Sequence, residues 1–205
     1  MTKVTLLGDS IRAIGYGARV AEMLKDRFEF FQPNDNCRFA KYTLRGLFDW
    51  EKDMRNSRIV HWNNGLWDVC NLFGDGLFTS ETEYLNNMTR IADILISRYE
   101  KVIFATTTPV NPQNPYNTNE DIERYNRLII PVLRGKGIII NDLYTLVASD
   151  IDRYIRKDDN IHLTEDGIRV CSIQVAKILT EVSKTLPLEQ APAPAAQEYI
   201  SGAPV

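Results

Sequence analysis

The sequence lacks the surplus of one charge that marks many classes of binding protein. Its 24 Lys and Arg residues are balanced by 27 Asp and Glu residues, which gives a formal net charge of −3 and a pI near 5.5. Nucleic-acid-binding proteins usually carry a basic surplus, so we expect no nucleic-acid partner. No apolar run approaches the roughly 20 residues of a membrane helix, so we also expect no membrane association.

Cysteine is scarce as well. Cys37, Cys70 and Cys171 are odd in number, and their spacing fits neither a disulfide framework nor a zinc site. We interpret them as reduced structural thiols. The N-terminus runs directly into the strand-like segment VTLLGDS without the features of a secretory leader, so a cytoplasmic location is expected.

Two common catalytic signatures are also missing. There is no Gly-x-Ser-x-Gly, which argues against an α/β-hydrolase, and no Gly-x-x-x-x-Gly-Lys-Ser/Thr, which argues against a P-loop enzyme. The 205 residues, 44% of them hydrophobic, suffice for one domain with a sizeable core, and no internal repeat divides them. We assign that domain to residues 1–186. The Pro- and Ala-rich residues 187–205 are expected to form a disordered tail.

Short apolar runs alternate with helical patterns along the domain. The runs are Val4–Leu7, Phe28–Phe31, Ile59–Trp62, Val102–Ala105 and Ile138–Ile140. The helical patterns are Ile11–Phe28, Leu44–Met54, Glu81–Tyr99, Glu120–Leu133, Leu143–Ile155 and Glu165–Leu186. This alternation predicts an α/β fold, a five-stranded parallel sheet with helices on both faces. Ligands of such sheets bind beyond the carboxyl ends of the strands, where we expect the chemistry.

The first candidate site follows the first predicted strand. Gly8-Asp9-Ser10 stands where that strand gives way to a helix, so the Ser10 hydroxyl is expected at the carboxyl edge of the sheet. Helix-end N–H groups there can stabilise the oxyanion that forms when a serine attacks an acyl carbon. The alternative is that Ser10 only caps the helix.

The second candidate site precedes the last predicted helix. Asp159 and His162 are three residues apart in one turn, so the carboxylate can hold the imidazole Nδ1–H and leave Nε2 free as a general base. The alternative is a solvated loop with Thr164 as a helix cap. A serine nucleophile needs such a base, and the only other histidine is His61, which we interpret as a buried strand residue.

Together, these two blocks resemble those of the SGNH hydrolases, also called GDSL lipases and esterases. Gly8-Asp9-Ser10 resembles the family's first block, and Asp159-Asn160-Ile161-His162 resembles its last, in the right order and at opposite ends of the chain. The resemblance covers the core from about residue 4 to the last helix. It implies a flavodoxin-like three-layer sandwich with a triad of Ser10, His162 and Asp159, and neither a cofactor nor a metal.

The third block departs from the family's usual Gly-x-Asn-Asp. The corresponding place reads His61-Trp62-Asn63-Asn64-Gly65-Leu66-Trp67-Asp68. The resemblance implies an oxyanion hole to which Ser10 contributes its N–H and an asparagine its side-chain amide. Asn64 is the first choice and Asn63 the second, since spacing does not decide between them. A plain Asn-Gly turn is the alternative.

The second block is the least similar. The family has a glycine N–H after the second strand, and Lys41 falls at that place here, with Gly46 as another candidate nearer a helix interior. Thr106, Thr107 and Thr108 are candidates for a pocket wall or for a capped turn. Four aromatic side chains are candidates for a flat apolar wall that binds a sugar ring, and packing in the core is the alternative. They are Phe48, Trp50, Trp62 and Trp67.

The resemblance implies a serine esterase that acts through an acyl-enzyme on a small-molecule ester. Without a lid-like apolar insertion, we expect a small acyl group, such as acetyl on a carbohydrate. Two alternatives stay open. One is a lysophospholipase or thioesterase with a longer acyl substrate, and the other is a non-catalytic binding module on the same fold. The sequence gives no oligomeric state.

Overall fold

The sheet is the central layer of the protein. The computed structural model describes residues 1–187, so the predicted disorder of the tail falls almost entirely outside the described residues. Within them lie five parallel strands in the spatial order β2-β1-β3-β4-β5. They are β1 (Thr2–Leu7), β2 (Phe28–Phe31), β3 (Ser57–Trp62), β4 (Lys101–Ala105) and β5 (Ile139–Asn141). This confirms the predicted five-stranded α/β architecture.

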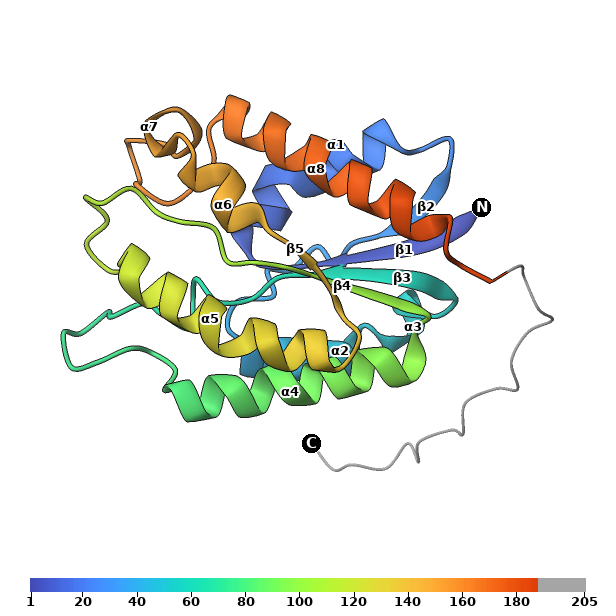
Figure 1. Cartoon of the computed structure of the whole chain (residues 1–205), viewed down its shortest axis with the longest axis horizontal. Coiled ribbons are helices and arrows are strands. Elements are labelled where there is room, and N and C mark those ends of the chain that lie inside the picture. The colour runs from blue at the N-terminus through green and yellow to red at the C-terminus, as the bar shows by residue number, and fades with distance from the viewer. Residues whose placement is uncertain (188–205) are drawn as a thin grey trace.

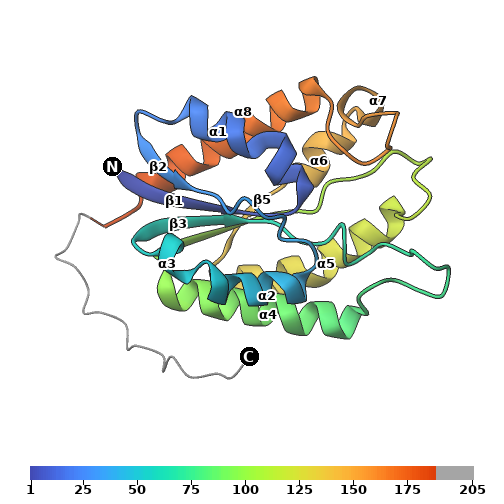
Figure 2. The ribbon, with the colours of Figure 1, turned by 180° about the vertical axis from the view of Figure 1, so that it is seen from behind.

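Helices cover both faces of the sheet, as Figures 1 and 2 show from opposite sides. One face carries α1 (Gly17–Met23) and α8 (Glu165–Ser183), and the other carries α2 (Ala40–Asp49), α4 (Glu81–Arg98) and α5 (Asn119–Gly135). The shorter helices are α3 (Glu51–Met54), α6 (Leu143–Ala148) and α7 (Ile151–Tyr154). The result is the predicted three-layer sandwich.

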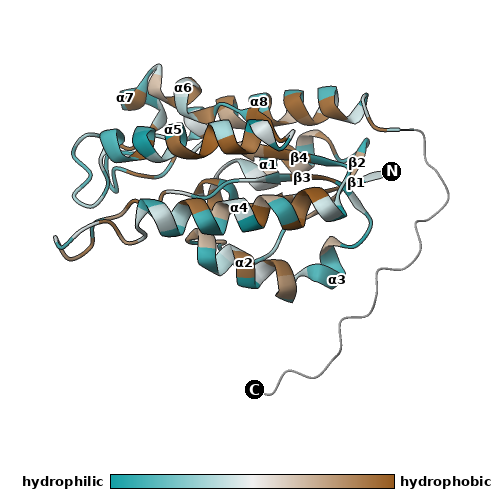
Figure 3. Cartoon of the chain, turned by 60° about the horizontal axis from the view of Figure 1, so that its bottom comes forward, coloured by the Kyte–Doolittle hydropathy of each residue, from teal (hydrophilic) through white to brown (hydrophobic). Residues whose placement is uncertain are grey.

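Burial explains why the strands appear in the sequence as mainly apolar runs. Val4, Leu6 and Leu7 of β1 are fully buried because helices cover both faces of a parallel sheet. The long helices instead alternate hydrophilic and hydrophobic residues, with their apolar sides toward the sheet (Figure 3). None of the helices in residues 1–187 combines the length and apolarity that a membrane span would need.

The predicted helix over Ile11–Phe28 is wrong in detail. A short π-helix, η1 (Ile11–Tyr16), comes first and α1 follows it, with non-helical backbone angles at Gly15. π-helical turns inside α-helices occur frequently at functional sites. Two other predicted helices are also divided, α2 from α3 at Trp50 and α6 from α7, where the Asp150 carboxylate caps a new start.

Since all five strands are parallel, their carboxyl ends meet at one edge of the molecule. The connections that follow β1, β3 and β4 lie together there, beside the segment that leads into α8 (Figure 1). The connection between β3 and α4 extends farther out and includes hydrophobic stretches (Figure 3). Residues far apart in the sequence thus come together at this edge.

Candidate active site

Ser10 stands between β1 and η1, at the carboxyl edge. Neighbouring backbone contacts leave little freedom there, because the Asp9 carbonyl accepts the N–H groups of Arg12 and Ala13, and the Asp9 carboxylate accepts that of Ile11. Ser10 itself has helical backbone angles and its side chain caps nothing. The capping alternative for Ser10 is therefore wrong, and the hydroxyl is free for another partner.

Gly8 permits a close approach between β1 and the segment after β3. A Cβ atom on Gly8 would lie 2.0 Å from Asn63 Oδ1 and 2.8 Å from Arg12 Cβ. Any side chain at this position would push the first and third blocks apart. Burial raises the pKa of the neighbouring Asp9 carboxyl, and a hydrogen bond from Asn63 partly offsets that rise.

His162 connects Ser10 with Asp159. Its Nε2 lies 2.9 Å from Ser10 Oγ and its Nδ1 lies 3.0 Å from Asp159 Oδ2. An ionised carboxylate only accepts hydrogen bonds, so Nδ1 carries the proton and Nε2 is left to accept one from the serine hydroxyl. The structure brings these three residues together in the geometry of a serine, a base and an orienting carboxylate.

Asp159 is held in its ionised form. Partial burial raises its pKa, but the N–H groups of His162 and Ile161 and the imidazole outweigh this and lower it overall. The two N–H bonds to Oδ1 are 2.9 and 3.0 Å long. Arg156 adds a positive charge 3.5 Å from Oδ2. The carboxylate therefore favours the imidazolium that would form when the base takes a proton.

His61, the other histidine, lies inside the molecule. It is fully buried on β3, its Nε2 lies 3.1 Å from the Asn141 side-chain amide, and its ring packs edge-on against Tyr16. Burial lowers its pKa to about 3, so it is neutral at physiological pH. His61 is thus a buried strand histidine and not a second base beside Ser10, but we expected its hydrogen bonds to be satisfied and Nδ1 has no partner among the described residues.

The two asparagines after β3 differ in their contacts. Asn64 Oδ1 accepts the indole N–H of Trp62 at 3.0 Å, which fixes the orientation of the amide, and Nδ2 donates to the Arg38 carbonyl at 2.9 Å. An amide nitrogen has two hydrogens, so one remains for a ligand. Asn63 Oδ1 instead accepts the Tyr16 hydroxyl at 3.2 Å. The Asn63 amide in turn donates to the Asp9 carboxylate, so each asparagine keeps one amide hydrogen without a partner.

The segment before α2 runs between the first and third blocks. Cys37 donates its N–H to the Gly8 carbonyl, and the Gly8 N–H points to Cys37 Sγ at 3.1 Å. Lys41 follows in the first turn of α2, with an exposed side chain that pairs with Glu83. Its side chain therefore does not narrow the approach to its N–H. Gly46 lies inside α2 against Trp50, away from the helix start.

The three threonines after β4 are buried structural residues. Thr107 Oγ1 donates to the Asn64 carbonyl at 2.9 Å and crowds Gly65, which has a φ of +146°. Thr106 Oγ1 accepts the Tyr144 N–H and bonds to Asp142. Thr107 thus supports the turn that carries Asn64 and Thr106 holds the start of α6, whereas Thr108 Oγ1 is buried without a partner among the described residues.

The four aromatic residues do not form one wall. Trp62 is buried against Phe104 in the core, whereas Phe48 is exposed near the end of α2 that points away from the carboxyl edge. Trp50 follows that same helix end, so only Trp67, which is partly exposed, lies in the connection after β3. A sugar platform built from all four is therefore wrong.

Asp68 is a residue of this region to which sequence reasoning assigned no role. Its side chain is completely buried, and both carboxylate oxygens accept the Ala40 N–H, at 3.1 and 3.2 Å. The available signal was an acidic residue between the apolar pairs Leu66-Trp67 and Val69-Cys70.

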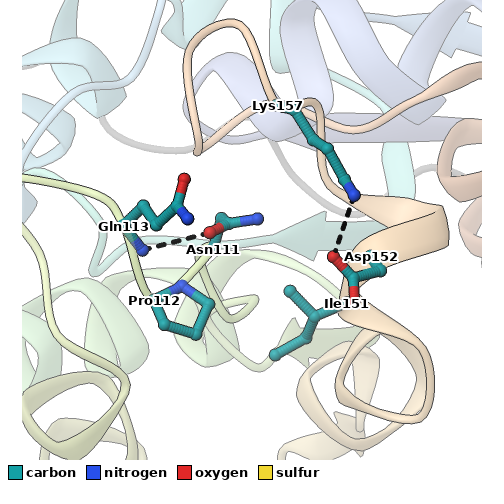
Figure 4. A pocket seen from close by; sticks show the side chains of 6 residues that line it. All are labelled: Asn111, Pro112, Gln113, Ile151, Asp152 and Lys157. Carbon is teal, nitrogen blue, oxygen red and sulfur yellow. Dashed lines mark hydrogen bonds and ion pairs between the residues drawn. The ribbon is translucent and has the colours of Figure 1, made fainter.

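A small cavity lies beside the segment that carries Asp159. Its volume is about 300 Å³, and Figure 4 shows its lining side chains, which come from the connection after β4 and from α7 with the loop that follows it. These residues are Asn111, Pro112, Gln113, Ile151, Asp152 and Lys157. Asn111 also donates its N–H to the Asn160 carbonyl at 3.0 Å, so the cavity wall supports the Asp159–His162 turn.

None of the three cysteines is placed to act as a nucleophile. Cys37, Cys70 and Cys171 are buried free thiols, and burial raises the pKa of Cys37 to about 11 and that of Cys171 to about 12. Such thiols are poor nucleophiles. Within residues 1–187, no three His, Cys, Asp or Glu side chains gather closely enough to form a metal-binding group.

Comparison with solved structures identifies the fold, although no protein-family model and no curated protein matches the chain in sequence. The acetyl xylan esterase AlAXEase superposes with a TM-score of 0.73 at 20% identity, over 86% of this chain and 99% of that one. The lipase/acylhydrolase from Enterococcus faecalis gives 0.73 at 19%, over 93% and 100%. A lipolytic G-D-S-L family protein from Veillonella parvula DSM 2008 gives 0.72 at 15%, over 88% and 99%. The chain therefore has the fold of the GDSL/SGNH esterases.

Proposed function

We propose that this protein is a serine esterase that cleaves carboxylic esters through an acyl-enzyme on Ser10. The observation that carries the proposal is the hydrogen-bonded chain from Asp159 through His162 to Ser10, at 3.0 and 2.9 Å. The esterases of the same fold add support, because a shared fold alone would leave the chemistry open and here the site has the matching groups.

Acylation begins with proton transfer from Ser10 to His162. As Oγ bonds to the acyl carbon, its proton moves to Nε2, and Asp159 stabilises the resulting imidazolium through Nδ1–H. Collapse of the tetrahedral intermediate breaks the bond to the alcohol oxygen, which takes the proton from Nε2. Water then attacks the acyl-enzyme with His162 as base, and the acid leaves as Ser10 regains its proton.

The negative oxygen of each tetrahedral intermediate needs hydrogen-bond donors. Three are proposed, the Ser10 N–H at the start of η1, the second hydrogen of Asn64 Nδ2 and the Lys41 N–H in the first turn of α2. Two of them belong to backbone beside a helix start, where unsatisfied N–H groups and the helix dipole favour negative charge.

A small acyl group, acetyl in particular, is the proposed substrate portion. The turn after β3 is closely packed, with Asn64, Gly65 and Thr107 in mutual contact and buried. The neighbour AlAXEase is an acetyl xylan esterase, which supports an acetylated carbohydrate as the alcohol portion.

The decisive experiment is hydrolysis of a chromogenic acetate ester by the purified protein and by its Ser10→Ala variant. Serine-dependent turnover supports an esterase, and a series of acyl chain lengths then distinguishes acetyl from the longer chains of a lysophospholipase or thioesterase. If the wild type and the variant are equally inactive toward all esters tested, the binding-module alternative holds.

A further inference from the structure

We propose that Asp68 is a positioning residue that holds the first turn of α2 so that the Lys41 N–H is presented to the oxyanion. The inference rests on the proposed esterase function and adds a residue that does not itself touch the substrate.

Asp68 is an expensive residue to bury. Its side chain has no exposed surface, and among the described residues no Lys, Arg or His forms an ion pair with it. Its partners are the Ala40 N–H and the Thr79 hydroxyl. A carboxylate without a cation costs more to bury than a neutral side chain of the same shape, so stability alone does not account for it.

Asn64 and Asp68 belong to one turn, and both form hydrogen bonds with the segment Arg38–Ala40. The Val69 N–H donates to the Gly65 carbonyl at 3.0 Å and closes this turn. From its start, Asn64 Nδ2 donates to the Arg38 carbonyl at 2.9 Å, and from its end Asp68 accepts the Ala40 N–H. The third block therefore fixes the second block on both sides of residue 39.

The held segment would not keep its conformation unaided. Arg38 has a φ of +48°, in the left-handed region that a residue with a Cβ atom adopts at a cost. Its N–H is taken by Asn36 Oδ1 at 2.7 Å. The contacts from Asn64 and Asp68 supply the restraint that keeps this conformation in place.

Asp68 also determines which N–H groups of α2 remain available. The first turn of any helix has N–H groups without intrahelical acceptors. Asp68 takes that of Ala40, and the Phe39 carbonyl accepts those of Tyr42 and Thr43. No acceptor within residues 1–187 is found for the Lys41 N–H, which leaves it for a ligand.

The charge of Asp68 changes close to neutral pH. Burial raises its pKa to about 7, against the bonds from Ala40 and Thr79, which lower it. The other titratable groups that act on it or feel its charge are Asp9, Cys70, Glu83, Tyr84 and Tyr125. The ionised form binds an N–H more strongly than the neutral acid does, so the helix start is held best above this pH.

The test compares Asp68→Asn with the wild type in steady-state hydrolysis of an acetate ester between pH 5 and pH 9. The asparagine keeps the size and one oxygen acceptor. We expect kcat to fall roughly tenfold or more with KM within about twofold, because a lost oxyanion donor acts in the transition state. On the acid side of the kcat/KM profile, the wild type should depend on two protonations, those of His162 and Asp68. The variant should depend on that of His162 alone.

Asp121→Asn is the matched control, because Asp121 accepts hydrogen bonds from Thr118 and Arg124 at the exposed start of α5 and should not affect turnover. If a folded Asp68→Asn protein has the kcat and the acid-side pH dependence of the wild type, the positioning role of Asp68 is overturned. The esterase proposal is then unaffected. Absence of Ser10-dependent turnover in the wild type would overturn both. Should Asp68→Asn not fold, Asp68→Glu, which keeps the charge but displaces it, must show the same selective loss of kcat.

Discussion

The hydroxyl oxygen of Ser10 and Nε2 of His162 lie 2.9 Å apart, although 152 positions separate the two residues in the chain. Only the parallel sheet explains this distance, since it delivers the end of β1 and the turn before α8 to one edge. Because the two side chains are in hydrogen-bond contact, replacing either one tests the proposed catalytic role of the pair.

Replacing Ser10 with Ala should lower ester turnover by about four orders of magnitude or more, because the nucleophile is lost while binding and oxyanion groups remain. The measurement is release of the chromophore from an acetate ester. Ser80→Ala is the control, since Ser80 only caps α4 through the Glu83 N–H. It should cost about 1 kcal/mol of stability and no turnover. Comparable rates for Ser10→Ala and the wild type would contradict the mechanism.

Asn64→Ala should lower kcat about 100-fold with little change in KM, because its amide would donate to the charge that develops in the transition state. Asn63→Ala should affect turnover less. Both variants should lose stability, since Asn63 accepts the buried Tyr16 hydroxyl and Asn64 accepts the buried Trp62 indole N–H. Parallel kinetics and thermal unfolding of both variants check this. The assignment fails if Asn63→Ala has the larger kinetic effect, or if neither variant slows turnover tenfold.

Asp68 should make the wild type less stable as pH rises. Its folded pKa is about 7 against an ordinary 3.8, so the folded state keeps a proton that the unfolded state has released. The contribution to stability is greatest below about pH 4 and is lost as pH rises through 7. Asp68→Asn should therefore gain up to about 4 kcal/mol relative to the wild type across that window, in urea unfolding at a series of pH values. A difference in unfolding free energy between the variant and the wild type that does not change with pH would contradict this prediction.

His61 should act in the opposite sense. Its folded pKa is about 3 against an ordinary 6.5, so below pH 6.5 the unfolded state binds a proton that the folded state does not. Stability is lost as pH falls through this window, by at most about 4 to 5 kcal/mol. His61→Gln should flatten that loss in the same unfolding series. The acid limb of its turnover should match the wild type, and a displaced limb would implicate His61 as a base.

Gly8→Ala should destabilise the protein by about 3 kcal/mol or more, because the new methyl group would overlap Asn63 Oδ1 and move the first block from the third. Gly135→Ala is the control. A Cβ at Gly135, the last residue of α5, meets nothing within 4 Å, so this change should be neutral or slightly stabilising. Thermal unfolding compares the two, and equal melting temperatures would refute the close-approach argument.

Local pattern sufficed for much of the fold. The buried apolar runs predicted all five strands to within two residues at either end, because a strand covered on both faces consists mostly of apolar residues. Periodicity was less reliable where a helix changes type or restarts. At Gly15, Trp50 and Asp150 the apolar spacing continues across a break that the backbone angles and caps impose.

The sequence by itself determined the strand order along the chain, the place of Ser10 after β1 and the local pairing of Asp159 with His162, all of which follow from spacing within one element or turn. Tertiary structure alone decided the rest. It gave Asn63 and Asn64 different partners, turned the Lys41 side chain outward and joined Asp68 to Ala40 across 28 positions. The physical reason is that a hydrogen bond across the sheet edge depends on how three loops pack together, and no periodicity within any one of them encodes that contact.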